Sequence, residues 1–484
     1  MPQLISLSLK EARQGLDRKD FTAVELTEAY LQRLSETEPL ISACLKVLDQ
    51  SARERAQTLD KLGPDPQLPL WGIPVTVKDL FNLQGVPTTA GSKMLANYHP
   101  SFEATVVKKL KLAGAIILAK TNLDEFAMGS STEFSAFGPT RNPWNLARVP
   151  GGSSGGAAAG ISAGQALGAL GTDTGGSIRQ PAALCGCVGL KPTYGRVSRY
   201  GIVAYGSSLD QAGPLTREVR DAGVILQAIA GPDGKDSTCS NLPVEDYLHL
   251  NPAQPDTLTL ALPPEFWEAD FPESVSKVLN DAKKSLTDAG IKIISASLPH
   301  IPYSVATYYI LAAAEASTNL ARYDGVRYGF QEEAVELIEL YRKSRTLGLG
   351  KETQRRILLG TFVLSSGYYD AYYKKAAQVR RLIQEDFVKT FQKATLILAP
   401  VSSIPAWPFG SFTEDPLTQY QLDIMTLPLN LAGLPGISLP AGLGSDGLPV
   451  GVQLMGPGFQ EKKLLEAALL LEKIFPKLPS PPLK

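Results

Sequence analysis

Residues 149–181 read VPGGSSGGAAAGISAGQALGALGTDTGGSIRQP, and the rest of the chain can be organised around this glycine-rich stretch. Ten of the 26 positions from Gly151 to Gly176 are glycine, and the polar side chains among them are small hydroxyls, one Gln and one Asp. Glycine in the interior of a helix or strand costs about 0.5–1 kcal/mol relative to alanine. So many glycines therefore indicate residues with positive φ angles, backbone segments that approach one another closely, or backbone N–H groups that are left free to bind another group.

Two common kinds of glycine-rich segment fit this stretch poorly. A flexible linker would not carry the apolar side chains of Ile161, Leu167 and Leu170. A phosphate-binding loop needs a lysine after its last glycine, and Ala157 follows Gly156 here. The stretch is therefore predicted to lie inside the fold and to present backbone N–H groups of the kind that catalysis needs.

The composition of the whole chain describes a large globular protein with little net charge. It has 484 residues, 47 basic and 48 acidic side chains and a formal net charge of -1. A chain with so even a balance of charge is not expected to bind nucleic acid by itself. We therefore expect a partner to hold most of any nucleic acid involved. Four cysteines without C-x-x-C spacing favour a reducing, cytoplasmic setting. With no secretory leader and no long apolar run in the sequence, we expect no membrane association.

Strands and helices are predicted to alternate along the chain. Capping-box patterns at Ser8-x-x-Glu11 and Thr22-x-x-Glu25 predict two amphipathic helices at its start. From Gly171 to Arg179 we expect a strand, a turn and a helix that opens at Ser177. Other predicted strands are 71–80, 116–119, 257–262, 291–296 and 395–399, and other predicted helices are 104–114, 272–289 and 460–474.

This alternation predicts an α/β fold in which helices cover both faces of a central mixed sheet. We expect residues 1–484 to form a single domain, because no internal repeat or long linker divides them. Within it we expect a helical layer over about 1–60, a core over about 70–230 and a remaining sheet and helical part over about 255–484.

Few residues could carry hydrolytic chemistry. The three histidines, His99, His249 and His300, lie beside proline or in polar loops, so a zinc site or a Ser-His-Asp triad has few candidates. Residues 151–155 match the G-x-S-x-G pattern of a nucleophile elbow, but no strand is predicted before them. A serine that attacks without histidine needs another base, and a desolvated lysine is the usual substitute.

Three separated blocks resemble the amidase signature family in order and spacing. They are GIPVTVKD at 72–79, GGSSGG at 151–156 and TDTGGSIRQPAALCG at 172–186. The resemblance implies a triad in which Ser177 is the nucleophile, Ser153 is a bridging serine after a cis peptide bond with Gly152, and Lys78 is the base. To accept a proton Lys78 must be neutral, which burial can achieve by lowering its pKa. The resemblance also implies an oxyanion hole made by the N–H groups of Thr174, Gly175, Gly176 and Ser177.

Four further blocks resemble a branch of this family that works within a tRNA-dependent glutamine amidotransferase. They lie at 191–211, 315–329, 359–376 and 428–442. The resemblance implies that the chain hydrolyses glutamine and supplies ammonia inside a heterotrimer with B and C subunits. The complex would convert Glu-tRNA(Gln) to Gln-tRNA(Gln), with Asp-tRNA(Asn) as a further candidate substrate. ATP and Mg²⁺ would be used by the B subunit, and this chain would bind no cofactor or metal. Glutamine is expected to contact Tyr308, Arg356, Asp423, Gly129 and Ser130.

Two other functions remain compatible with the sequence. A free-standing amidase that acts on small or fatty amides would turn over without partners and would not need Arg356 or Asp423. A catalytically inactive scaffold would only stabilise its partners. The presence of Lys78, Ser153 and Ser177 argues against such a scaffold.

Overall fold

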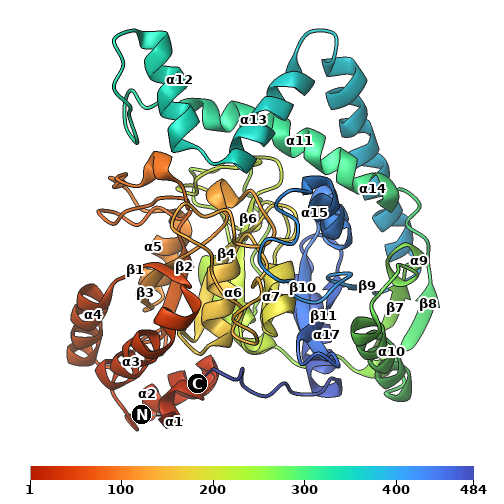
Figure 1. The fold of residues 1–484 in the computed structure, drawn as a ribbon. Helices are drawn as coiled ribbons and strands as arrows, with labels where there is room; N and C mark the ends of the chain where they lie inside the picture. Colours follow the sequence, from red (N-terminus) through yellow and green to blue (C-terminus); the bar gives the residue numbers. More distant parts are fainter. Residues whose placement is uncertain (1, 484) are drawn as a thin grey trace.

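The computed structural model describes residues 2–483 and is built on one mixed sheet of 11 strands (Figure 1). The strands are β1 (Cys44–Val47), β2 (Pro74–Lys78), β3 (Ile116–Thr121), β4 (Gly168–Asp173), β5 (Val188–Lys191), β6 (Gln211–Thr216), β7 (Thr259–Leu262), β8 (Lys292–Ser295), β9 (Leu396–Pro400), β10 (Gly436–Leu443) and β11 (Pro449–Met455). Their order across the sheet is β1-β3-β2-β4-β6-β5-β10-β11-β9-β7-β8. β2 pairs in parallel with β3 and β4, whereas β4 and β6 are antiparallel. The predicted mixed sheet is therefore confirmed.

Helices cover both faces of this sheet, as predicted. They are α1 (Pro2–Ile5), α2 (Leu9–Arg18), α3 (Ala23–Ile41), α4 (Asp49–Leu62), α5 (Thr105–Leu112), α6 (Gly155–Ser162), α7 (Arg179–Cys185), α8 (Val219–Ile229), α9 (Pro264–Trp267), α10 (Glu273–Asp288), α11 (Ser304–Asn319), α12 (Leu337–Gly348), α13 (Lys351–Leu364), α14 (Lys375–Phe391), α15 (Pro416–Leu422), α16 (Leu427–Ala432) and α17 (Glu461–Ile474). Neighbouring residues of β4 show the two faces, because successive side chains of a strand point in opposite directions. Ala169 belongs to the core that contains the alanines of α6 and α7, whereas Leu170 belongs to the core that contains the apolar side chains of α8 and α17.

Local patterns predicted several elements correctly. Both capping boxes are present, with Ser8 and Glu11 at the start of α2 and Thr22 and Glu25 at the start of α3. The βαβ unit predicted after residue 257 is also confirmed, because α10 connects β7 to β8 and these strands pair in parallel.

Two predicted boundaries shift where turns intervene. The strand predicted from residue 71 begins at Pro74, because Gly72, with a φ of 74°, forms a turn before it. The helix predicted to open at Ser177 begins at Arg179. Here the Asp173 carboxylate accepts backbone hydrogen bonds from the turn that precedes α7.

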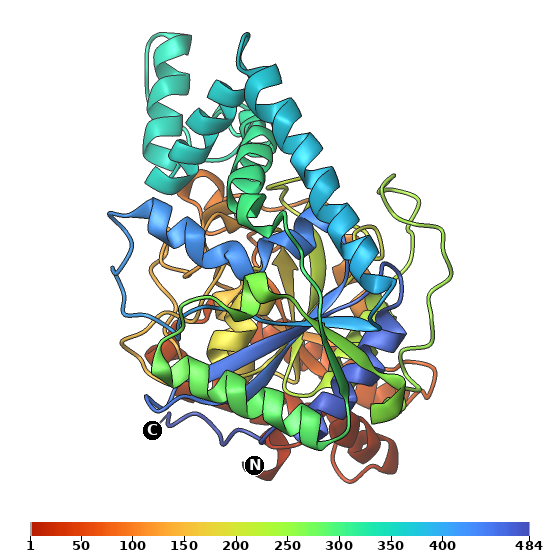
Figure 2. The same ribbon diagram turned by 90° about the vertical axis from the view of Figure 1, so that its right-hand side faces the viewer.

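Helices α11, α12, α13 and α14 form a layer that rises above the rest of the molecule in both views (Figures 1 and 2). α11 packs against α13 and α14. Through α11 and α13 this layer contributes Tyr308 and Arg356 to a cavity beside the loop that follows β4. Among the helices formed by residues 2–483, none is long and apolar enough to cross a membrane.

Candidate active site

Lys78 is fully buried at the carboxyl end of β2, where it faces three hydroxyl groups. Its Nζ lies 2.8 Å from Ser153 Oγ, 3.0 Å from Ser154 Oγ and 2.9 Å from Thr172 Oγ1. Burial lowers the pKa of Lys78 to about 7, although nearby carboxylates, Asp124 foremost, oppose the shift. A substantial fraction of Lys78 is therefore neutral near pH 7 and carries a lone pair that can accept a proton.

Ser153 follows a cis peptide bond with Gly152, just before α6 begins. A Cβ atom on Gly152 would lie 2.6 Å from the backbone nitrogen of Ser131, so this position accepts no larger residue. The next residue, Ser154, donates its backbone N–H to the carbonyl of Ser177 at 3.1 Å. This bond joins the two halves of the glycine-rich stretch. Within residues 2–483, no direct hydrogen bond links the hydroxyls of Ser153 and Ser177.

Ser177 lies in the loop between β4 and α7, and Asp173 shapes that loop. The Asp173 carboxylate accepts the N–H of Gly176 at 2.8 Å and that of Ile178 at 3.3 Å. The Gly176 N–H is thus already engaged, unlike the expectation that every N–H group of residues 174–177 is available. Among residues 174–177, the backbone N–H groups of Thr174, Gly175 and Ser177 have no hydrogen-bond partner within the described part of the chain.

A buried ion pair holds this loop against the sheet. Arg179 Nε lies 3.1 Å from Asp173 Oδ2, and both side chains are fully buried. Arg179 also donates to Gln453 Oε1 at 2.7 Å and to Asn430 Oδ1 at 2.5 Å. Burial alone would raise the pKa of Asp173, but the charge and hydrogen bonds of Arg179 outweigh it and lower the pKa to about 2. The carboxylate therefore stays ionised at neutral pH.

Replacing Arg179 by methionine is expected to destabilise the fold by about 3–5 kcal/mol, because the change leaves Asp173 as an unpaired buried charge. Urea unfolding followed by circular dichroism measures this loss. Arg381→Met is the matched control, since Arg381 pairs with Glu385 at the surface, where the side chains are 68% and 40% exposed. The control should change the free energy of unfolding by less than about 1 kcal/mol. Equal losses in both variants would contradict the importance of the buried pair.

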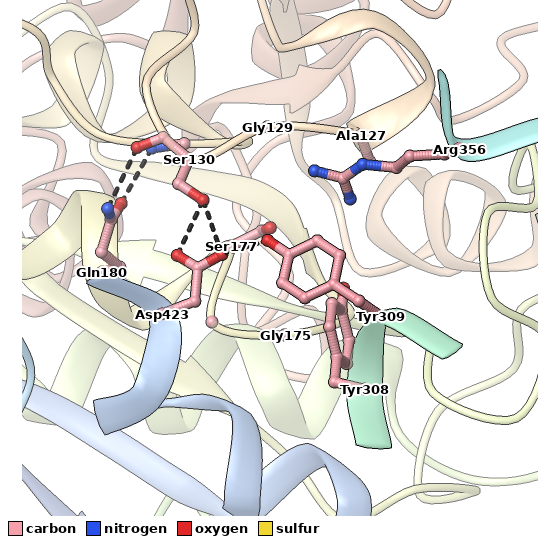
Figure 3. Close-up of a pocket in the computed structure, with 12 residues that line it drawn as sticks. Ala127, Gly129, Ser130, Gly175, Ser177, Gln180, Tyr308, Tyr309, Arg356 and Asp423 are labelled. Atoms are coloured by element: carbon pink, nitrogen blue, oxygen red, sulfur yellow. Dashed lines mark hydrogen bonds between the residues drawn. The ribbon is translucent and has the colours of Figure 1, made fainter. Parts of the chain in front are cut away.

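A small cavity opens beside Ser177 (Figure 3). Arg356 and Asp423 reach it from opposite sides. The residues that line it are Ala127, Gly129, Ser130, Gly152, Gly175, Gly176, Ser177, Gln180, Tyr308, Tyr309, Arg356 and Asp423. The structure thus brings together all five residues expected to contact glutamine, next to Ser177. The predicted site residues Lys78, Ser153 and Thr174 are buried and do not line the cavity.

The two charged groups of the cavity are each held by hydroxyl groups. Asp423 accepts a hydrogen bond from Ser130 Oγ at 2.7 Å and one from the Tyr309 hydroxyl at 2.8 Å. Burial raises the pKa of Asp423 to about 6. Arg356 Nη1 donates to the Tyr205 hydroxyl at 2.7 Å. A cation and a carboxylate that face one small cavity match the carboxylate and ammonium groups of an α-amino acid.

Comparison with known proteins places this chemistry in a family. The protein-family model described as amidase matches residues 25–465. The chain belongs to the amidase family. Among curated relatives, the A subunit of glutamyl-tRNA(Gln) amidotransferase from Nitratidesulfovibrio vulgaris strain DP4 is 55% identical over 485 residues, which cover 99% of this chain and 99% of that protein.

Solved amidase structures show the same fold. The crystal structure of the A subunit of glutamyl-tRNA(Gln) amidotransferase from Thermotoga maritima is 44% identical, with a TM-score of 0.81, and the match covers 100% of this chain and 97% of that one. The native peptide amidase from Stenotrophomonas maltophilia is 30% identical, with a TM-score of 0.81 and 98% of each chain covered. The family resemblance predicted from the three sequence blocks is therefore confirmed.

Sequence reasoning missed four residues of this amidase site, namely Ser154, Thr172, Gln180 and Tyr309. The first two contact Lys78, and Tyr309 contacts Asp423. Gln180 joins two segments of the cavity wall, because its Nε2 donates to the Ser130 carbonyl at 3.0 Å and its Oε1 accepts the Gly152 N–H at 2.9 Å. Each missed residue lies within a resembling block or beside a predicted residue, and this closeness is the signal that could have found it.

Proposed function

We propose that this amidase is the glutaminase component of a tRNA-dependent amidotransferase and hydrolyses the side-chain amide of free glutamine. The observation that carries the proposal is that Arg356 and Asp423 face each other across the cavity that Ser177 also lines. The guanidinium would pair with the α-carboxylate of glutamine and Asp423 with its α-ammonium. The side chain of glutamine would then extend toward Ser177. Gly129, Ser130 and Tyr308 would complete this binding site.

Acylation would begin with attack of Ser177 Oγ on the amide carbon of glutamine. The proton of Ser177 would pass to Ser153 while the proton of Ser153 passes to Lys78. The 2.8 Å contact between Lys78 Nζ and Ser153 Oγ supports this second transfer. When the C–N bond breaks, the proton would return from Lys78 through Ser153 to the leaving nitrogen, which departs as ammonia. Water would then hydrolyse the acyl-Ser177 ester to release glutamate.

Backbone N–H groups would stabilise the negative oxygen of the tetrahedral intermediate. The groups of Thr174, Gly175 and Ser177 are the available donors. Gly176 would join them only if its N–H left the carboxylate of Asp173. A donor of this kind contributes roughly 10²–10³-fold to the rate, because it is already oriented when charge develops.

Both amidotransferase relatives are named as the A component of a larger enzyme, and we extend that setting to this chain as part of the proposal. The chain would work in a heterotrimer with B and C subunits. The B subunit would use ATP and Mg²⁺ to activate the glutamate of Glu-tRNA(Gln), with Asp-tRNA(Asn) as a second candidate. A net charge of -1 suits a chain that leaves the tRNA to its partner. We propose no cofactor or metal for this chain and a cytoplasmic place of action.

Ammonia release tests this function for the chain alone and for the complex with its B and C partners, Glu-tRNA(Gln) and ATP. We expect glutamine hydrolysis to rise strongly in the complex and to be matched by formation of Gln-tRNA(Gln). Efficient hydrolysis of small or fatty amides by the lone chain, with no response to partners, would favour a free-standing amidase instead. Absence of ammonia release in every mixture would favour an inactive scaffold.

A further inference from the structure

Arg356 is held inside the protein by partners that leave one edge of its guanidinium for the cavity. Its Nε donates to Glu352 Oε1 at 2.7 Å and its Nη1 to the Tyr205 hydroxyl at 2.7 Å. The rings of Tyr309 and Tyr420 lie 5.0 Å and 5.3 Å from its Cζ. An arginine has five N–H donors in a rigid planar fork. The fork therefore cannot turn away from the cavity without breaking these contacts.

Glu352 is the ionic partner of Arg356 and lies one helical turn before it on α13. Its side chain is 4% exposed, and the oxygen that accepts Arg356 Nε also accepts the Tyr420 hydroxyl at 2.6 Å. Its second oxygen pairs with Arg355. Burial favours the neutral acid, but the charge of Arg356 and the hydrogen bond from Tyr420 hold the pKa of Glu352 below its usual range. Glu352 thus keeps a full charge on the side of Arg356 away from the cavity.

Tyr420 connects this ion pair to the other charged group of the cavity. Its ring stacks on that of Tyr309, with centroids 3.9 Å apart and 22° between the planes. The Tyr309 hydroxyl donates to Asp423 Oδ2 at 2.8 Å. Tyr420 itself lies in α15, three residues before Asp423. A continuous series of contacts therefore runs from Glu352 to Asp423 and fixes how far apart the cation and the carboxylate stand.

We propose that Glu352 and Tyr420 are positioning residues that set Arg356 to receive a substrate α-carboxylate, and that they make the site selective for amides of free α-amino acids. The inference rests on the proposed function, in which the α-carboxylate of glutamine pairs with Arg356. An amide without that carboxylate gains nothing from the alignment of Arg356. A peptide-bound glutamine has neither of the two charges that the cavity spaces apart.

The test compares three amides in the complete complex with Glu352→Gln and with Tyr420→Phe. Glutamine carries both α groups, glutaramate lacks the ammonium, and 4-aminobutyramide lacks the carboxylate. We expect both variants to raise KM for glutamine and glutaramate roughly tenfold, since hydrogen bonds to charged groups contribute at this level. The kcat for these two amides should stay nearly unchanged, and kcat/KM for 4-aminobutyramide should not move. A purely structural role would not separate the substrates in this way.

Glu339→Gln and Tyr372→Phe are the matched controls, because Glu339 pairs with Lys343 at the surface and Tyr372 is 40% exposed. Neither control should change KM for any of the three amides. An unchanged KM in Glu352→Gln and Tyr420→Phe, or equal losses with all three amides, would overturn the inference. If the wild-type complex shows no preference for amides with an α-carboxylate, the binding mode of the proposed function fails as well. A wild-type preference that the variants leave intact would refute the positioning role alone.

Discussion

Ammonia release from glutamine is expected to fall by roughly 10⁶-fold when Ser177 is replaced by alanine, as when a nucleophilic serine is removed from a protease. The proposed acyl bond forms on Ser177 Oγ, and no other serine of the cavity can take its place. Ser130 is the other serine that lines the cavity, and its hydroxyl donates to Asp423 at 2.7 Å. A coupled assay for ammonia on the complex with its partners measures the loss.

Ser51→Ala is the matched control for this experiment, because Ser51 is exposed on α4. It should leave ammonia release unchanged. Ser177→Ala should still bind glutamine in calorimetry, since Arg356 and Asp423 are untouched. Undiminished ammonia release by Ser177→Ala would refute the nucleophile assignment.

The parts of the fold that the sequence predicts are those decided by neighbours along the chain. A capping box needs only a hydroxyl and an acid three residues apart, so Ser8 with Glu11 could be placed from the sequence alone. The pairing of β5 with β10 could not be predicted in this way, because nothing in the residues Val188–Lys191 identifies a neighbouring strand so distant in sequence. The start of α7 was missed for a related reason, since the side chain of Asp173 competes for the N–H groups that precede it.

The residues of the candidate site also divide into those that the sequence predicts and those that depend on the folded sheet. Lys78, Ser153 and Ser177 lie in blocks that can be compared with a family, so the sequence predicts them. Thr172 reaches Lys78 because β2 pairs in parallel with β4, with Val77 opposite Leu170. That register is set by the folded sheet and cannot be read from the sequence of either strand.

The stacking of tyrosine rings around Arg356 was beyond prediction for the same physical reason. Tyr309 lies on α11 and Tyr420 on α15, and their rings stack only in the folded chain. Tyrosines on helices most often belong to a core or an interface. Nothing in the sequence shows that two of these rings connect the cation and the carboxylate of one cavity.

Replacing Lys78 by methionine is expected to lower kcat for glutamine by about 10²–10⁴-fold, which is the usual contribution of a general base. Methionine fills a similar volume but has no lone pair of comparable basicity, so Ser153 would have no group to receive its proton. Lys78→Arg is the informative companion, because guanidinium keeps the positive charge and stays protonated in proteins. A base at this position requires both variants to fail. Activity retained in Lys78→Arg would mean that only the charge matters and would contradict proton transfer to Lys78.

The pH dependence of the wild-type complex gives the same assignment an independent test. Burial lowers the pKa of Lys78 to about 7, and the protonated amine cannot accept a proton. The value of kcat/KM should therefore rise about tenfold per pH unit up to pH 7 and level off above it, because this ratio reports the pKa of an essential base in the free enzyme. Asp423, whose pKa is raised to about 6 by burial, loses the charge that would hold the α-ammonium below that pH, so the slope should steepen there. In Lys78→Met the change of kcat/KM near pH 7 should disappear, because that change reports the base. The change near pH 6 should remain, because it reports Asp423. If the change near pH 7 survives this substitution, it comes from another group, and Lys78 is not the proton acceptor.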